Sequence, residues 1–156
     1  MKYLIFVILF LCSNISAYEL NGTWVSDKEK TLKWIGENLK EDVEFTQDLS
    51  KILGHHYITY HNEKTCSYMS EWKTETKTNE AFSMPTQKYN IIAKNDYGFV
   101  VSSEHYIFML IFESDNSYYG VALDTEEYGH PGSREYYKRI EPNNEIRAAS
   151  KDCFPT

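Results

Sequence analysis

The chain has 156 residues, and it carries 16 Lys and Arg against 23 Asp and Glu for a formal net charge of −7. This length suits one domain with its own hydrophobic core. A chain this acidic, with no basic run, is a poor candidate for binding nucleic acid or an anionic membrane.

Residues 1–17 have the pattern of a secretory signal peptide. One basic residue precedes the uncharged run 4–12, which is too short to span a bilayer. Small residues then lead to Ala17, after which we expect cleavage; an anchor that stays attached is the alternative. Residues 18–156 are therefore expected to form a single secreted or periplasmic domain with no membrane span after signal cleavage.

Two cysteines, Cys66 and Cys153, remain once Cys12 leaves with the signal. In an oxidising compartment two cysteines most economically form one disulfide. The alternative is a catalytic or metal-binding thiol, but no partner cysteine lies at the two-to-four-residue spacing of a zinc site. The sequence therefore predicts a Cys66–Cys153 disulfide.

Residues 27–53 have the pattern of a helical hairpin. Ser26 as N-cap and Glu29 three residues later form a capping box. Thr46 is the expected cap of a second helix, and Gly54 stands where helices end. The apolar residues of the first helix recur at spacings of three and four: Leu32, Ile35 and Leu39.

After Gly54 the hydrophobic period becomes two, which indicates β-strands. Including a short first strand, the expected strands are 20–25, 56–61, 65–73, 87–94, 97–104, 106–112, 117–123 and 134–140. Short turns join most of them, and the polar segment 75–85 is expected to be a loop. Local antiparallel connections favour a mainly β fold, an up-and-down barrel of about eight strands with the helical hairpin after the first strand.

Three features carry a family resemblance: the motif Gly22-Thr23-Trp24 in the first strand, the basic-aromatic last strand 134–140, and the cysteine pair. With them the chain resembles the calycin superfamily, and most of all the lipocalin-like domains of small secreted bacterial proteins. The helical hairpin is similar to the lid of fatty-acid-binding proteins. The resemblance implies a structural role for Trp24 and Arg139, which would stack on each other in a cation–π contact.

The resemblance also implies a ligand site on the last strand. Fatty-acid-binding proteins hold a carboxylate with an Arg-x-Tyr pair, to which Arg134 and Tyr136 correspond, because a guanidinium binds two oxygens and a phenol donates a third bond. Lys138 shares that face. The alternative is that these charges are solvated on the exterior while Tyr136 packs. Whether the face of Arg134 or that of Glu135 points inward stays open.

The strand 106–112 is apolar on both faces, so one face is expected to line the barrel and the other to lie under the helices. Tyr106 and Phe108 are the candidate ligand contacts on the lining face. The many aromatic residues of the strands are as consistent with core packing as with an aromatic cavity.

We find no catalytic constellation, and the protein is expected not to be an enzyme. No nucleophile elbow, zinc-binding helix motif or phosphate loop occurs. His55 and His61 lie too far apart on a strand to share a metal ion, and His56 faces the other way, so all three are interpreted as surface histidines. The segment 128–132 is expected to be a turn, and no metal or cofactor is predicted.

These observations lead to two functional hypotheses. The first is a secreted or periplasmic lipocalin-like protein that binds a small hydrophobic, possibly anionic, ligand inside the barrel. The alternative is a periplasmic protein-interaction module, an inhibitor or immunity protein with a solid barrel. The polar segment 75–85 and the acidic surface motivate the alternative.

Overall fold

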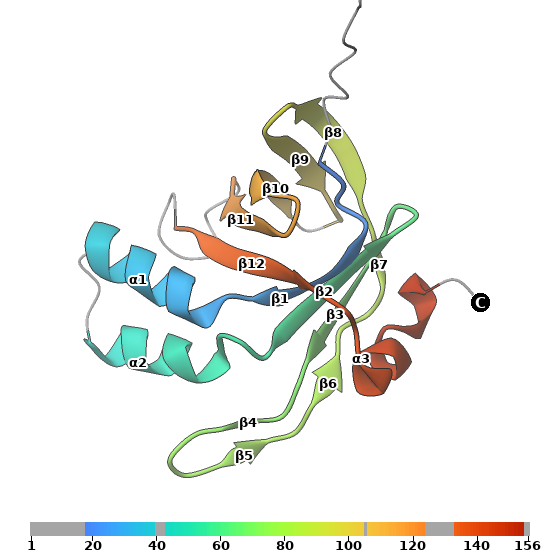
Figure 1. Ribbon diagram of the computed structural model, residues 1–156. Coiled ribbons are helices and arrows are strands. Elements are labelled where there is room, and N and C mark those ends of the chain that lie inside the picture. Colours follow the sequence, from blue (N-terminus) through green and yellow to red (C-terminus); the bar gives the residue numbers. More distant parts are fainter. Residues whose placement is uncertain (1–17, 40–42, 105, 124–132, 155–156) are drawn as a thin grey trace, which may run out of the picture.

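The computed structural model describes residues 18–39, 43–104, 106–123 and 133–154, so the predicted signal peptide and the segment 128–132 lie outside the described residues (Figure 1). The long strands are β1 (Gly22–Ser26), β2 (His56–His61), β3 (Lys64–Met69), β8 (Asn90–Asn95), β9 (Gly98–Ser102), β10 (Ile107–Ser114), β11 (Ser117–Ala122) and β12 (Glu135–Ile140). The short strands are β4 (Trp72–Lys73), β5 (Thr78–Asn79), β6 (Phe82–Ser83) and β7 (Gln87–Lys88). The helices are α1 (Lys28–Asn38), α2 (Val43–Ile52), α3 (Asn144–Ala149) and the 3₁₀ turn η1 (Lys151–Cys153).

The strands form a curled antiparallel sheet in the order β6-β3-β2-β1-β12-β11-β10-β9-β8, with β7 also paired to β3. The fold is mainly β, as predicted, but the sheet is a half-barrel that does not close. The expected number of about eight strands is also wrong, because the described residues form twelve. The additional strands are the two-residue pieces β4 to β7.

The half-barrel stays open where the chain passes from one outer strand to the other. β7 pairs with β3 over two residue pairs, and the chain then crosses at Tyr89 to β8, which pairs only with β9. The backbone N–H of Tyr89 donates to the Glu63 carbonyl, which fixes the crossing. The predicted strand 87–94 is therefore two strands, β7 and β8, which pair at opposite edges of the sheet.

One end of the half-barrel is tightly packed around Trp24 of β1. Its indole is fully buried, its Nε1–H donates to the Leu20 carbonyl at 3.0 Å, and the Arg139 guanidinium lies 4.4 Å from its ring centroid. A Cβ on Gly22 would approach Arg139 Nη1 to 2.8 Å, and the φ angle of this glycine is +133°. Only glycine fits beside this guanidinium, which explains the Gly-x-Trp pattern physically.

A second close approach occurs where β9 meets β10. A Cβ on Gly98 would lie 1.9 Å from the Leu110 carbonyl oxygen, closer than any side chain can approach a backbone atom. Gly98 follows the turn between β8 and β9. Asn95 stabilises this turn, because its side-chain oxygen accepts hydrogen bonds from the backbone N–H groups of Tyr97 and Gly98.

The predicted helical hairpin is present after β1, but its caps differ from the prediction. The N-cap of α1 is Asp27, whose carboxylate accepts from the Lys30 N–H, whereas Ser26 still belongs to β1. The predicted cap Thr46 lies inside α2. Since Asp27 accepts through its side chain as readily as serine, the capping pattern was misplaced by one residue.

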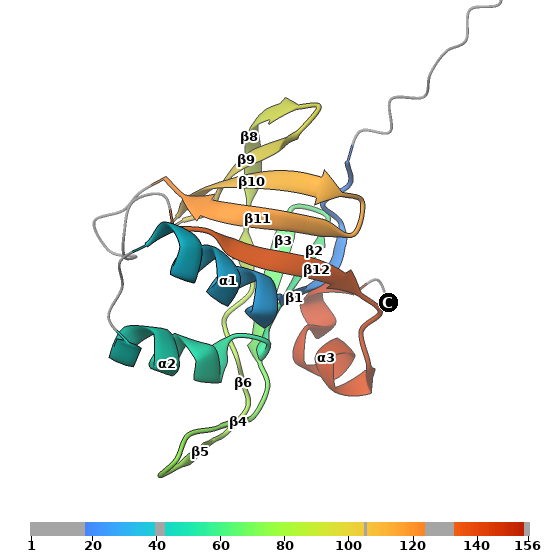
Figure 2. The ribbon, with the colours of Figure 1, turned by 60° about the vertical axis from the view of Figure 1, so that its left-hand side comes forward.

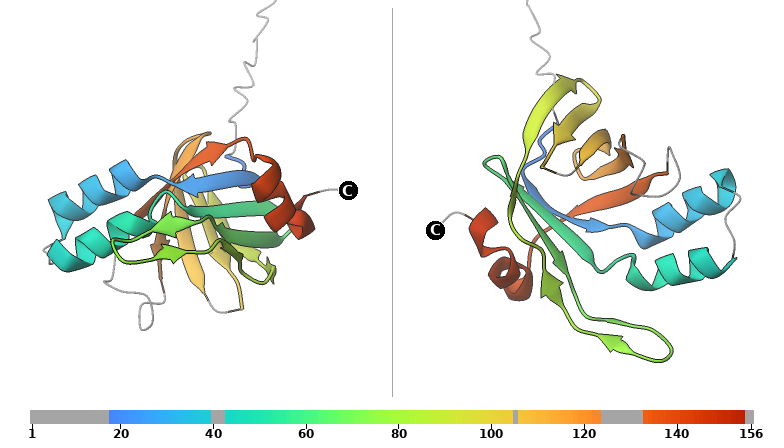
Figure 3. Two further views of the ribbon diagram at one scale, coloured as in Figure 1. Left: turned by 90° about the horizontal axis from the view of Figure 1, so that it is seen from below. Right: turned by 180° about the vertical axis from the view of Figure 1, so that it is seen from behind.

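Helix α1 packs on the outer face of β12. The backbone N–H of Tyr136 donates to Thr31 Oγ1, and its carbonyl accepts from the Asp27 N–H. Lys30 lies 4.9 Å from the Tyr136 ring centroid and also contacts Glu113 of β10. The helices α1 and α2 lie at one end of the sheet and α3 at the other (Figures 2 and 3).

The C-terminal elements cover the outer face of β2 and β3. Cys66 of β3 is bonded to Cys153 of η1, with a sequence separation of 87, and this is the pair that the sequence predicts. Tyr68, on the same face as Cys66, donates a hydrogen bond to Glu145 of α3. The disulfide therefore holds the tail against the edge of the sheet, outside its concave face.

The segment 75–85 is not the loop that its polarity suggests. β4 and β5 form a small ribbon that projects from the body below α2 (Figure 1), and β6 then rejoins β3. Across the base of this ribbon, the rings of Trp72 and Phe82 lie 6.2 Å apart. In the part of the chain that the structure describes, no helix is long and apolar enough to cross a membrane.

Candidate ligand pocket

The concave face of the half-barrel holds a pocket of about 220 Å³. Strands β2, β3, β9, β10, β11 and β12 contribute its lining, and the segment between β6 and β8 passes over it with Met84, Pro85, Gln87 and Tyr89. Because side chains of a strand alternate between the two faces, every second residue of β2, β3, β10, β11 and β12 reaches the pocket, whereas β9 contributes the consecutive residues Val101 and Ser102 at its end. On β12 these residues are Glu135 and Tyr137.

The deep end of the pocket is formed by buried residues, among them Tyr60, Leu110 and Tyr118. Burial raises the pKa of Tyr60 to about 12, and burial also raises the pKa of Tyr118 well above its ordinary value. The Tyr118 hydroxyl approaches that of Tyr60 but makes no well-formed hydrogen bond. The deep end is therefore formed by neutral side chains.

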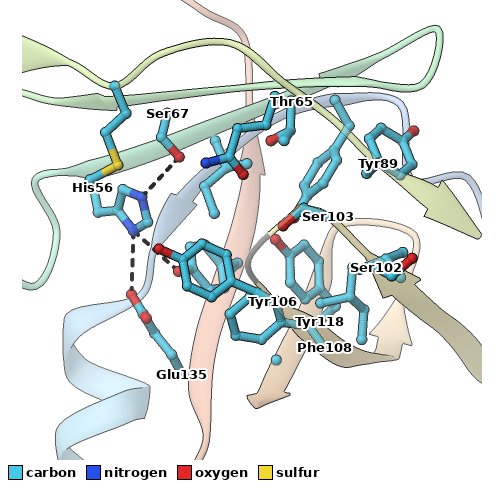
Figure 4. A pocket seen from close by; sticks show the side chains of 18 of the residues that line it. His56, Thr65, Ser67, Tyr89, Ser102, Ser103, Tyr106, Phe108, Tyr118 and Glu135 are labelled. Carbon is cyan, nitrogen blue, oxygen red and sulfur yellow. Dashed lines mark hydrogen bonds and ion pairs between the residues drawn. The ribbon is translucent and has the colours of Figure 1, made fainter. Parts of the chain in front are cut away.

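Near the mouth, four polar side chains meet (Figure 4). His56 Nδ1 lies 3.8 Å from a Glu135 carboxylate oxygen and 3.2 Å from the Tyr137 hydroxyl, and His56 Nε2 lies 3.4 Å from Ser67 Oγ. Burial, reinforced by the negative charge of Glu135, raises the pKa of Tyr137 well above its ordinary value. The cluster thus contains one carboxylate, one imidazole and two hydroxyl groups.

The pocket has a negative electrostatic character. Among the described residues that line it, none is Lys or Arg, and the Glu135 carboxylate forms no ion pair with either residue type. In the part of the chain that the structure describes, its one ion-pair partner is His56, which is charged only when protonated. Ser103, also in the lining, has a buried hydroxyl oxygen with no hydrogen-bond partner.

Arg134 and Tyr136, the predicted carboxylate-binding pair, lie on the other face of β12. The Arg134 guanidinium stacks over Trp34 of α1 at 5.4 Å and over Tyr119 at 4.4 Å. Tyr136 packs beneath Lys30 of the same helix. Both side chains hold α1 against the sheet. The prediction that they contact a ligand in this pocket is therefore wrong.

Tyr106 and Phe108, the other predicted ligand contacts, do line the pocket. Their ring centroids lie 5.8 Å apart, and Figure 4 shows both rings beside the pocket. The helical hairpin, in contrast, does not cover the pocket as a lid would, because no residue in the described part of α1 and α2 lines it.

Reasoning from the sequence missed His56 and Glu135 as pocket residues. His56 was interpreted as a surface histidine, yet its side chain is only 22% exposed. A signal was present in the pairing of Trp24 with Arg139. If Arg139 meets a buried indole on the concave face, the two-residue period places Glu135 and Tyr137 on that face as well.

Within the described ranges, no group of three or more His, Cys, Asp or Glu side chains could hold a metal ion. Comparisons of the chain with protein families, with curated proteins and with solved structures gave no match.

Proposed function

We propose that the protein is a binding protein that holds a small, largely apolar molecule inside the half-barrel. The observation that carries the proposal is a pocket of about 220 Å³ on the concave face, lined mainly by apolar and aromatic side chains. Burial of apolar ligand surface contributes roughly 25 cal/mol per Å². A ligand that fills this volume would therefore gain its binding free energy chiefly from contact with the apolar and aromatic lining.

The charges around the pocket bear on the ligand's charge. The sequence suggested an anion because of Arg134, whose guanidinium stacks outside the pocket on Trp34. Glu135 would repel an anionic ligand, and no lining Lys or Arg among the described residues would offset that repulsion. We therefore propose that the ligand is not an anion, in contrast to a fatty acid.

We further propose that the protein is exported and that its likeness to the calycins is a true relationship. The half-barrel with Trp24 beneath Arg139 supports the relationship, and the Cys66–Cys153 disulfide supports export, since disulfides persist in oxidising compartments. The small volume is below the usual range of about 300–1,000 Å³ for ligand pockets, which favours a compact ligand over a long lipid chain.

Filling the pocket tests the proposal. The missing side chain of Gly120 leaves room in the lining, and a Cβ there would make an ordinary 3.5 Å contact with Leu110. We expect the uncharged fluorescent probe N-phenyl-1-naphthylamine to bind the wild-type protein, and Gly120→Phe to weaken this binding at least about tenfold by occupying the same volume.

Val121→Phe is the matched control, because the neighbouring residue on β11 does not line the pocket. Its binding should equal that of the wild type, and circular dichroism should show that both variants are folded. Absence of probe binding to the wild type, or equal binding by folded Gly120→Phe, would contradict the proposal. Native mass spectrometry before and after denaturation would reveal a ligand retained through purification.

The second candidate function, a protein-interaction module, is favoured by the projecting β4–β5 ribbon. Exposed Phe82 and Met84 lie just beyond it and could contact a partner. If this function holds, replacing residues 74–78 with a tight turn abolishes capture of a partner protein but leaves probe binding intact. Unchanged capture by the shortened chain would argue against this candidate.

A further inference from the structure

We infer that the ligand of the pocket is a compact amphipathic amine, whose ammonium group is bound by the Glu135 carboxylate at the mouth. This inference rests on the proposed function, because it specifies the chemical class of the molecule that occupies the same pocket. Four observations carry it: the exposure of the carboxylate and its lack of a permanent countercharge, the side chains that orient it, the aromatic lining and the volume of the pocket.

The carboxylate of Glu135 is accessible and has no permanent countercharge. Its side chain is 39% exposed, so a ligand group entering from the mouth can reach it. In the described part of the chain, the only basic group within 4.0 Å is the imidazole of His56. A ligand ammonium would supply the missing positive charge, and a charge-assisted hydrogen bond is about twice as strong as a neutral one.

The neighbours of Glu135 hold the carboxylate toward the pocket. The Tyr137 hydroxyl lies within hydrogen-bonding distance of His56 Nδ1, and it also interacts with Glu135. His56 is itself positioned by Ser67 on β3. The carboxylate is therefore oriented by residues of three strands, β2, β3 and β12, which is the arrangement expected of a preorganised binding group.

Aromatic rings line the same pocket as the Glu135 carboxylate. Tyr106, Phe108 and Tyr137 all line the pocket, and Figure 4 shows Tyr106 and Phe108 facing the space beside the His56–Glu135 pair. Ring faces attract cations through their quadrupole, and they also provide apolar surface for the remainder of the molecule. Carboxylate and aromatic rings together discriminate a cationic amphiphile from an anion of the same shape.

The volume of the pocket sets the size of the amine. About 220 Å³ is less than drug-sized ligands occupy, so the apolar part should be a compact group of rings rather than an extended chain.

Three compounds of matched shape and different charge test the inference. Isothermal titration at pH 7.5 would compare 2-phenylethylamine, 2-phenylethanol and phenylacetate. We expect the amine to bind about tenfold more tightly than the alcohol, and phenylacetate to bind most weakly. Glu135→Gln should weaken binding of the amine about tenfold and leave binding of the alcohol unchanged, which also shows that the variant is folded.

Glu141→Gln is the control variant, because it removes one exposed negative charge just after β12, outside the pocket. It should leave the preference for the amine intact. If Glu135→Gln fails to fold, Glu135→Asp keeps the charge with a shorter reach and should reduce the preference for the amine without reversing it.

The outcomes separate the two proposals. If neither these compounds nor N-phenyl-1-naphthylamine binds the wild-type protein, the proposed pocket function itself fails. If the neutral probe or the alcohol binds but the amine binds no more tightly than the alcohol, or if Glu135→Gln retains the preference, the amine inference alone is overturned.

Discussion

The two ends of the concave face share strands β10, β11 and β12 but are packed differently. Around Trp24 the rings of Phe112 and Tyr118 make edge contacts with the indole at 5.7 and 4.7 Å, and no space is left. Beyond Tyr118 the concave face opens into the pocket, where Glu135 has no Lys or Arg partner among the described residues. One end is filled by its own side chains, and the other leaves a volume of about 220 Å³.

The contrast is sharpest along the inner face of β12. Arg139 at the packed end lies over an indole and donates to the backbone carbonyls of Glu19, Asn21 and Asp115. Among the described residues, Glu135 at the open end has only His56 as an ion-pair partner. A charged side chain whose hydrogen-bond donors are all paired within the protein stabilises the fold. A charged side chain without such partners is available to bind a ligand.

The largest expected effect is at the packed end. Trp24→Ala should lower the free energy of unfolding by about 3–5 kcal/mol, because the indole is fully buried and the cavity would not collapse completely. Urea denaturation followed by circular dichroism measures this loss. Phe108→Ala, which truncates an aromatic side chain bordering existing space, should cost clearly less; equal losses would mean that the two ends are packed alike.

A smaller effect should appear at the pocket end when the pH is raised. The folded protein holds the Tyr60 proton up to about pH 12, against about 10 in the unfolded chain, so this stabilisation is complete below pH 10 and is lost as the pH rises to 12. Two pH units correspond to about 3 kcal/mol. Urea denaturation at several pH values should show the loss, and Tyr60→Phe should make it smaller.

The smallest effects compare the two charges of β12. Arg139→Met should destabilise the protein by roughly 1–3 kcal/mol through loss of the cation–π contact and of hydrogen bonds to backbone carbonyls. Glu135→Gln should change the free energy of unfolding by less than about 0.5 kcal/mol. The Glu135 side chain is 39% exposed, and its ion-pair contact with His56 is long, at 3.8 Å. Thermal unfolding of both variants would measure the difference, and a large loss for Glu135→Gln would assign this residue a structural role.

Much of the fold follows from local pattern. The strand 56–61 matches β2, and the turn after it has positive φ angles at Asn62 and Glu63, of which asparagine is the type that tolerates this conformation readily. What could not be predicted was which strands pair at the edges. The two-residue period of 87–94 identifies a strand, but nothing local indicates that its two parts pair with β3 and with β9.

The site was predicted less well than the fold for a related reason. Tyr106 and Phe108 were found because an apolar strand must turn one face inward. Arg134 was misplaced because its charge and spacing fit a ligand carboxylate as well as they fit Trp34 of α1. The position of a charge on one face of a strand is decided by the elements packed against the sheet, and these are distant in sequence.

The contact between Gly98 and the backbone of β10 has an evolutionary consequence. Since any side chain there would collide with the Leu110 carbonyl, glycine should be invariant at this position in every homologue that keeps the pairing of β9 with β10. Glycine should be retained at position 22 as well, because a φ angle of +133° is strained for any other residue. The two glycines form a signature by which divergent members of the lineage could be recognised when little else of the sequence is shared.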